Sequence, residues 1–272
     1  MALVTTRASA RVIVTRPERE AHTWAHELHS RGVHTDILPL IGIGALPDAR
    51  PLWQAWYALP GHLAVMFVSA NAVRFFMAAR PPEQPVPPCR AWSTGPGTQA
   101  ALLAVGWPAE LIDSPDEQAA QFDSEALWSV VAQSVRSAVK TAGGSDHPSV
   151  LIVRGGDDRG QVAGRDWLSQ TLESEGLTVV QVVAYVRQAP QLSQAQRELA
   201  HQAMTDGSWW LFSSSEAAQH LLQACPDLRL EQARALATHP RIAERLKKSG
   251  WGQVHTVPAG LDAQALSIKS MA

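Results

Sequence analysis

The chain carries the same pattern of residues twice. Val12-Ile13-Val14-Thr15-Arg16 returns as Leu151-Ile152-Val153-Arg154, and Phe67–Ala72 returns as Phe212–Ala217. Matches that recur at a nearly fixed offset, here roughly 140 residues, indicate a duplicated unit, because chance matches would scatter. Two similar units commonly bind a small molecule in a cleft between them.

Composition limits the partners that such a chain can have. Its 272 residues are 46% hydrophobic, enough for two ordinary cores, and the net charge of −2 gives no reason to expect nucleic acid. Cys89 and Cys225 are too few for a disulfide framework, and no histidine has the partners that a zinc site needs. No stretch approaches the length of a membrane span. We therefore expect a cytoplasmic protein with no metal and no membrane contact.

Short apolar runs alternate with helical patterns, which is typical of a parallel sheet with helices on both faces. Strands are expected at 12–15, 33–38, 63–68, 90–93, 150–154, 178–185, 209–212 and 233–237. Two segments rich in proline or in glycine and serine, 81–88 and 137–148, are predicted to be surface loops. The fold class is therefore α/β.

The two copies do not divide the chain at its midpoint. Each copy begins with a strand, a helix and a second strand. If the chain crosses between lobes after this second strand, it leaves the first lobe near residue 40 and returns near 187. We therefore expect a discontinuous first lobe, 1–40 with 187–272, and a second lobe, 44–183.

Polar residues and glycines follow the predicted strands, where helices begin. Ligands of parallel α/β sheets bind at these strand ends, and a helix N-terminus offers a carboxylate both N–H donors and the positive end of a dipole. The candidate ligand contacts are Arg16, Ser69, Asn71, Gly97, Thr98, Arg154, Gly155, Ser213, Ser214 and Arg241. Six such helix starts would suit a ligand with many negative groups, whereas no nucleotide-binding spacing of glycines is present.

Each candidate also has an ordinary structural explanation. Ser, Thr and Asn are preferred helix caps, and Arg16 and Arg154 could form salt bridges with neighbouring helices. Tyr185 is one of only two tyrosines and lies where the chain crosses between lobes. Its phenol could donate a proton to a ligand or could pack the crossing with its hydroxyl in water.

Taken together, these motifs resemble those of the uroporphyrinogen-III synthase family over nearly the whole chain. Their order and spacing carry the resemblance, since no single motif is specific. The matching segments are Val14–Pro17, Phe67–Val73, Gly95–Leu102 with Gly106, Asp123–Leu127, Arg154-Gly155 with Gly164–Leu168, Ala184–Arg187, Phe212–Ser214 and Thr238–Ala243.

The resemblance implies two flavodoxin-like lobes joined by a two-stranded β-ladder, and a cofactor-free lyase of tetrapyrrole biosynthesis. Members close hydroxymethylbilane, a linear tetrapyrrole with eight carboxylates, into uroporphyrinogen III with loss of water and inversion of the last pyrrole ring. Uncatalysed closure leaves that ring uninverted. The resemblance further implies that Tyr185 assists departure of the hydroxyl and that Thr98 and either Ser213 or Ser214 contact the substrate. Arg241 lies in a stretch that departs from the family pattern, so only a carboxylate contact is expected of it.

A non-enzymatic sensor or binding protein for a small anionic ligand is the alternative function. A sensor is expected to carry an output segment, whereas an enzyme turns over an excess of substrate. In either case we expect a monomer.

Overall fold

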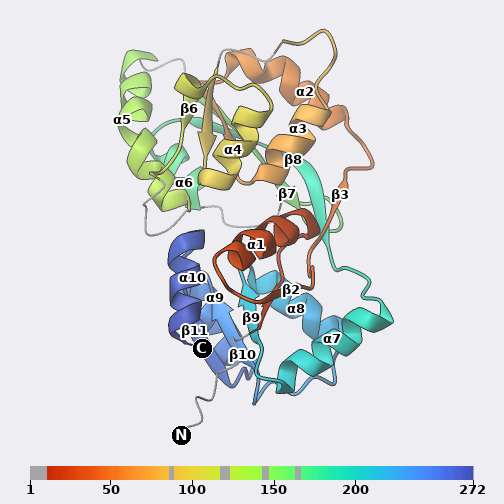
Figure 1. Cartoon of the computed structure of the whole chain (residues 1–272). Coiled ribbons are helices and arrows are strands. Elements are labelled where there is room, and N and C mark those ends of the chain that lie inside the picture. The colour runs from red at the N-terminus through yellow and green to blue at the C-terminus, as the bar shows by residue number, and fades with distance from the viewer. Residues whose placement is uncertain (1–10, 86–88, 117–122, 143–146, 163–166, 272) are drawn as a thin grey trace, which may run out of the picture. The chain divides into compact units, whose positions relative to one another are not determined.

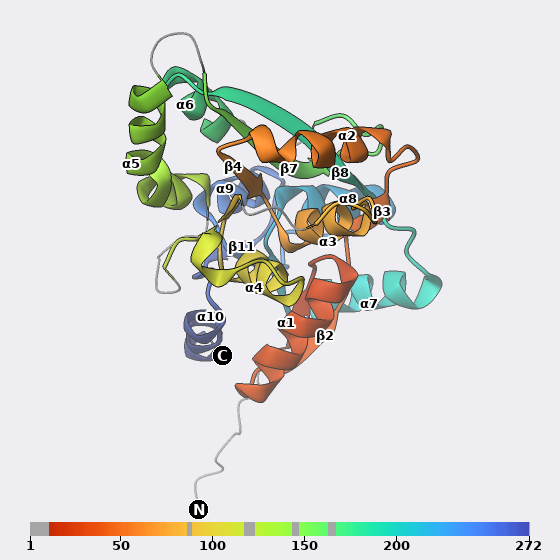
Figure 2. The same cartoon turned by 90° about the horizontal axis from the view of Figure 1, so that it is seen from above.

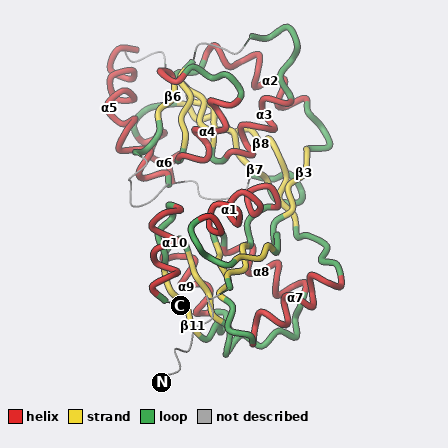
Figure 3. The backbone as a smooth tube through the Cα atoms, viewed as in Figure 1, coloured by secondary structure: helices red, strands yellow, loops and turns green. Residues whose placement is uncertain are grey.

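The computed structural model describes residues 11–85, 89–116, 123–142, 147–162 and 167–271. The chain forms two compact units, Met1–Gly42 with Gln188–Ala272 (unit 1) and Ile43–Arg187 (unit 2). In Figure 1 the colours show that unit 1 combines the red N-terminal segment with the blue C-terminal segment. Figure 3 shows strands and helices in both units.

Unit 1 is built around a five-stranded sheet in the order β11-β10-β9-β1-β2, with every neighbouring pair parallel. Its strands are β1 (Val12–Val14), β2 (Thr35–Ile37), β9 (Trp209–Phe212), β10 (Arg234–Ala237) and β11 (Gln253–Thr256). Its helices are α1 (Glu18–Ser30), α7 (Gln194–Thr205), α8 (Ser215–Ala224), α9 (Pro240–Lys248) and α10 (Leu261–Ser270).

Unit 2 is built around a six-stranded sheet in the order β3-β8-β7-β4-β5-β6. Its strands are β3 (Gly42–Ala45), β4 (Ala64–Phe67), β5 (Arg90–Ser93), β6 (Ile112–Asp113), β7 (Ser149–Gly156) and β8 (Thr178–Gln188). Its helices are α2 (Arg50–Ala58), α3 (Ala70–Ala78), α4 (Pro96–Ala104), α5 (Ser124–Ala142) and α6 (Trp167–Ser174). Two single-turn helices, Leu59–Gly61 and Ala109–Leu111, complete the unit. Strands β7 and β8 run side by side in both Figure 1 and Figure 2.

The two sheets share one strand order. Strands β2-β1-β9-β10-β11 of unit 1 correspond to β8-β7-β4-β5-β6 of unit 2, and this correspondence matches the repeat in the sequence. In each sheet the chain order reverses once, between β1 and β9 in unit 1 and between β7 and β4 in unit 2. We call these two places the switch points, where parallel α/β sheets usually bind their ligands.

The central strands are buried on both faces, as their continuous apolar runs predict. In unit 2, Leu151 and Val153 pack on the side of α2 and α3, where Trp56 and Phe76 stack with ring centroids 4.6 Å apart. Alternate residues of β7, such as Ile152, pack on the opposite side against α5 and α6. Unit 1 has a comparable core between its sheet and helices α1 and α10.

The α/β fold with two sheets of mainly parallel strands is confirmed, and several sequence predictions are corrected. The predicted loop at 137–148 is wrong for residues 137–142, which continue α5 because Val131, Val135 and Val139 form one apolar stripe. The strand expected at 33–38 is shorter, Thr35–Ile37. Strand β3 lies beside β8 at the edge of the six-stranded sheet.

Other expected segments fall partly outside the described residues. This holds for 86–88 of the predicted loop at 81–88 and for 164–166 of the matching segment that begins at Gly164. Among the residues that the structure describes, no helix combines the length and the apolar character needed to cross a membrane.

Candidate functional site

Polar side chains of unit 1 gather where β1 and β9 end, at its switch point. The buried Thr15 hydroxyl donates to the Leu211 carbonyl over 2.7 Å and so joins the ends of the two strands. Beyond β9, Ser214 caps α8, because its Oγ accepts the Glu216 N–H at 3.1 Å. Ser213 precedes this cap and is partly exposed. Ser214 therefore acts as a helix cap in the structure. A serine that caps a helix can still contact a ligand.

Arg16 is the cation at this switch point. Its guanidinium carbon lies 3.8 Å from the centre of the Trp24 ring. Among the described residues Arg16 forms no salt bridge, and its buried Nε has no hydrogen-bond partner. Burial lowers the pKa of Arg16 to about 10, an effect that Glu20 opposes, so the side chain still carries its charge at neutral pH. A desolvated cation without a salt-bridge partner is suited to bind a carboxylate.

The switch point of unit 2 brings a serine and a tyrosine together. Ser69 follows β4 and caps α3, because its Oγ accepts the Ala72 N–H at 3.1 Å. The same Oγ lies 3.0 Å from the Tyr185 hydroxyl. We call Ser69 and Tyr185 the hydroxyl pair. Tyr185 is only 4% exposed, whereas Ser69 is partly exposed.

Two further residues hold the ring of Tyr185. Phe75 of α3 stacks on it, with ring centroids 5.7 Å apart and an interplanar angle of 29°. Gly155 lies on the neighbouring strand β7, so close that a Cβ there would be 2.6 Å from Cζ of Tyr185. Sequence reasoning missed Phe75, because an aromatic residue inside a helix normally signals core packing.

Arg154 and Gly155 are not where the sequence placed them. They were expected to open a helix, but β7 continues through Gly156, because Gly155 and Gly156 pair with Tyr185 and Val186 of β8. Arg154 is 4% exposed, and its Nη1 donates to Oε1 of Gln181 over 2.8 Å. Arg154 is therefore held inside unit 2.

The remaining candidates lie near the starts of α3, α4 and α9. Asn71 is in the first turn of α3, where its Oδ1 accepts a hydrogen bond from Arg74 at 2.8 Å. At the start of α4, Thr98 is 6% exposed, and the position where a Cβ of Gly97 would lie faces open space. Arg241 is exposed in the first turn of α9, and its N–H donates to Nδ1 of the cap residue His239 at 3.1 Å.

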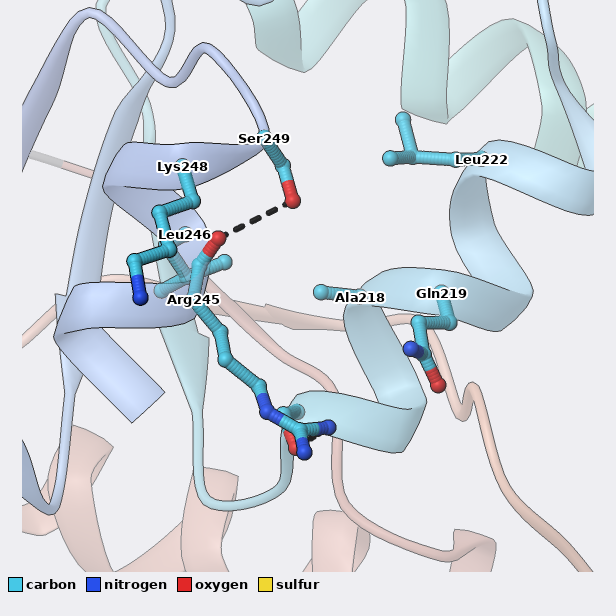
Figure 4. A pocket seen from close by; sticks show the side chains of 8 residues that line it. Ala218, Gln219, Leu222, Arg245, Leu246, Lys248 and Ser249 are labelled. Carbon is cyan, nitrogen blue, oxygen red and sulfur yellow. Dashed lines mark hydrogen bonds between the residues drawn. The ribbon is translucent and has the colours of Figure 1, made fainter. Parts of the chain in front are cut away.

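A cavity of about 340 Å³ lies elsewhere in unit 1, between α8 and α9. Figure 4 shows Arg245 pointing from α9 toward α8, where its Nη1 donates to Ser215 at 3.3 Å. None of the predicted site residues lines this cavity. Within the described ranges, no group of three or more His, Cys, Asp or Glu side chains could hold a metal ion.

The strand order and the polar switch points define a class: an α/β protein that carries the same parallel-sheet unit twice, with candidate ligand groups at equivalent strand ends. Residues 22–266 match the family model described as uroporphyrinogen-III synthase HemD. The match covers most of the chain, and the chain belongs to the uroporphyrinogen-III synthase family.

Solved structures have the same fold. The chain is similar to uroporphyrinogen-III synthetase from Helicobacter pylori 26695, with 16% identity, 97% of this chain and 100% of that chain covered, and a TM-score of 0.58. It is also similar to a mutant uroporphyrinogen III synthase from the extremely thermophilic bacterium Thermus thermophilus, with 15% identity, coverage of 96% and 98%, and a TM-score of 0.54. The family predicted from the sequence is confirmed.

Proposed function

We propose that this protein catalyses the closure of hydroxymethylbilane to uroporphyrinogen III, with loss of water and inversion of the last ring. The family match supports this reaction. The observation in the structure that carries the proposal is the hydroxyl pair at the unit 2 switch point, where a phenol and a serine hydroxyl lie 3.0 Å apart. A paired hydroxyl of this kind can supply the proton that the departing hydroxyl of the substrate needs.

The chemistry begins with that departure. Protonation of the substrate hydroxyl releases water and leaves an electrophilic azafulvenium cation. The substituted carbon of the last ring then attacks it to form a spiro-pyrrolenine, which fragments and closes again with the ring inverted. In this proposal Tyr185 is the source of the proton, and the rest of the site holds the flexible substrate in the conformation that leads to the spiro intermediate.

Carboxylate binding is the second task of the site. Arg16 is a partly buried, charged group with no salt bridge in the part of the chain that the structure describes, so its guanidinium could bind a substrate carboxylate. The starts of α3, α4, α8 and α9 supply further donors through Ser69, Asn71, Gly97, Thr98, Ser213, Ser214 and Arg241. The contact with Tyr185 supports including Gly155 in the proposed site, and the bond of Arg154 to Gln181 joins β7 to β8.

The proposal extends to the organisation of the molecule. We infer that 1–40 with 187–272 and 44–183 act as two flavodoxin-like lobes whose polar strand ends engage one substrate molecule. We further infer that the enzyme acts as a cytoplasmic monomer without cofactor or nucleic acid. The sequence predictions and the shared strand order support this organisation.

A multiple-turnover assay with hydroxymethylbilane tests the proposed function. The products are oxidised and the type I and type III isomers are separated by chromatography. We expect mainly type III in a large excess over enzyme, because the uncatalysed reaction gives type I. Formation of type I alone, at the rate seen without protein, would refute the proposal and favour the anion-binding alternative.

A further inference from the structure

Strand β8 contains an irregularity that decides where Tyr185 points. Pairing with β7 runs from Arg154 opposite Val183 directly to Gly155 opposite Tyr185, so Ala184 is the extra residue of a β-bulge. In a regular strand, alternate residues face opposite sides of the sheet, and Tyr185 would face the same side as Gln181 and Val183. Gln181 lies on the α6 side, where it donates to Ser169 at 3.1 Å.

The bulge places Tyr185 on the opposite side of the sheet. Val182, Ala184 and Tyr185 all belong to the core cluster that includes residues of α2 and α3, although Ala184 and Tyr185 are consecutive. Bulges of this kind redirect side chains near active sites. Here the bulge brings the phenol to the start of α3, where it meets Ser69.

Gly155 makes room for this arrangement. A Cβ at position 155 would lie 2.6, 2.8 and 2.9 Å from Cζ, Cε2 and OH of Tyr185, distances that van der Waals contact does not allow. The phenol therefore lies directly over the backbone of Gly155, with Phe75 stacked on it. Gly155 is thus a positioning residue for Tyr185, which is a different role from the ligand contact expected from the sequence.

The hydrogen bonds of Ser69 allow a proton to pass from Tyr185 to Ser69, although either hydroxyl can be the donor in the contact between them. A serine Oγ has two lone pairs and one proton. One lone pair accepts the Ala72 N–H, and the Tyr185 hydroxyl is within hydrogen-bond distance of the other. If Tyr185 donates to Ser69, the proton of Ser69 remains for a further acceptor. Ser69 is also the more exposed member of the pair.

We propose that the proton reaches the substrate through Ser69 and that Tyr185 acts behind it as the proton source, an inference that rests on the proposed function. Ser69 Oγ–H gives its proton to the leaving hydroxyl, the carbon–oxygen bond breaks and water departs. Tyr185 O–H restores the proton on Ser69 and becomes a phenolate. The proton that ring closure releases from the last pyrrole ring returns to the phenolate, so protons and electrons balance.

A double-mutant cycle tests this relay with hydroxymethylbilane as substrate. Because both hydroxyls carry the same proton, we expect Ser69→Ala and Tyr185→Phe each to lower kcat by about 10²-fold, with KM little changed for Tyr185→Phe. The double variant should be no slower than either single variant, within about threefold. Ser69→Thr, which keeps a hydroxyl, should recover most of the lost kcat.

Controls separate the relay from a loss of structure. Ser193→Ala removes a comparable helix cap, that of α7, and should leave kcat unchanged. Gly155→Ala should displace the phenol and lower kcat by at least about tenfold. Gly61→Ala should have no effect, since no atom lies within 4 Å of the position of its Cβ.

The outcomes distinguish this inference from the proposed function. Wild-type protein that forms no type III isomer refutes the function itself. Wild-type protein that forms type III while Ser69→Ala keeps kcat within about threefold overturns the relay alone. Losses that multiply in the double variant, or a Ser69→Thr variant as slow as Ser69→Ala, also overturn the relay.

Discussion

Ser69 and Ser214 occupy the same place in the two copies of the repeat. Each follows a central strand, and each caps the helix that begins there. Only Ser69 has a phenol beside it, because the bulge in β8 turns Tyr185 toward α3. The two units therefore share the same frame, and one local irregularity turns a phenol toward the helix cap of unit 2 alone.

Arg16 and Arg154 form the complementary comparison. Both follow the repeated apolar strand motif in the sequence. Arg154 is enclosed within unit 2 and bonds to Gln181, whereas Arg16 stacks on Trp24 and forms no salt bridge among the described residues. We propose that unit 1 contributes charge for binding and that unit 2 contributes the groups for proton transfer.

The largest expected effect comes from the phenol of unit 2. Tyr185→Phe should lower kcat by about 10²-fold, because it removes the proton source while the ring still fills the space over Gly155. KM should change little, since binding is assigned to other groups. Steady-state kinetics with separation of the isomers measures this effect, and an unaltered kcat would remove Tyr185 from the chemistry.

Replacement of Arg16, the cation at the switch point of unit 1, should weaken substrate binding. Arg16→Gln should raise KM by about tenfold or more with little change in kcat, because it removes a charge-assisted hydrogen bond worth about 1.5–3 kcal/mol. It also removes the contact with the Trp24 ring, so thermal stability should fall by only about 0.5–2 kcal/mol. Arg19→Gln, a change on the exposed surface of α1, is the matched control. A loss of stability with unchanged KM would mean that Arg16 is structural.

Loss of the Ser214 hydroxyl in unit 1 should lower activity less than loss of the Ser69 hydroxyl in unit 2. Ser214→Ala should reduce kcat/KM only severalfold, because one donor among many is partly replaced by water or a neighbouring N–H. The same holds for Thr98→Val and Ser213→Ala. If Ser214→Ala were as damaging as Ser69→Ala, the functional difference between the two units would be wrong.

The smallest effect is expected from the thiols. Burial raises the pKa of Cys89 to about 11 and also raises the pKa of Cys225, so both thiols stay protonated at neutral pH. Thiols in this form are poor nucleophiles. Iodoacetamide at pH 7 should leave activity unchanged. Loss of activity in proportion to alkylation of either cysteine would show that a thiol takes part.

Many of the strands and helix ends could be predicted from the sequence. The apolar runs 90–93 and 209–212 are strands with the same bounds in the structure. Gly32 and Gly106 follow α1 and α4 with positive φ, a conformation that glycine adopts easily at the end of a helix. These features were predictable because burial on both faces and a left-handed glycine each leave a local pattern.

The site was less predictable, because its geometry depends on contacts across strands. The bulge that redirects Tyr185 leaves no mark in the alternation of a strand that is apolar on both faces. The repeat made Arg16 and Arg154 appear equivalent, and only the packing of Gln181 against Arg154 separates them. The partner of Arg16, Trp24, had the pattern of an ordinary helix residue.

The division of tasks between the units can be measured directly as binding. Uroporphyrinogen III is titrated, in reduced form, into the wild-type protein, Arg16→Gln and Tyr185→Phe, and the Kd is determined for each. The account predicts a Kd about tenfold or more above wild type for Arg16→Gln and within about twofold of wild type for Tyr185→Phe. Equal weakening by both substitutions, or normal binding by Arg16→Gln, would contradict it.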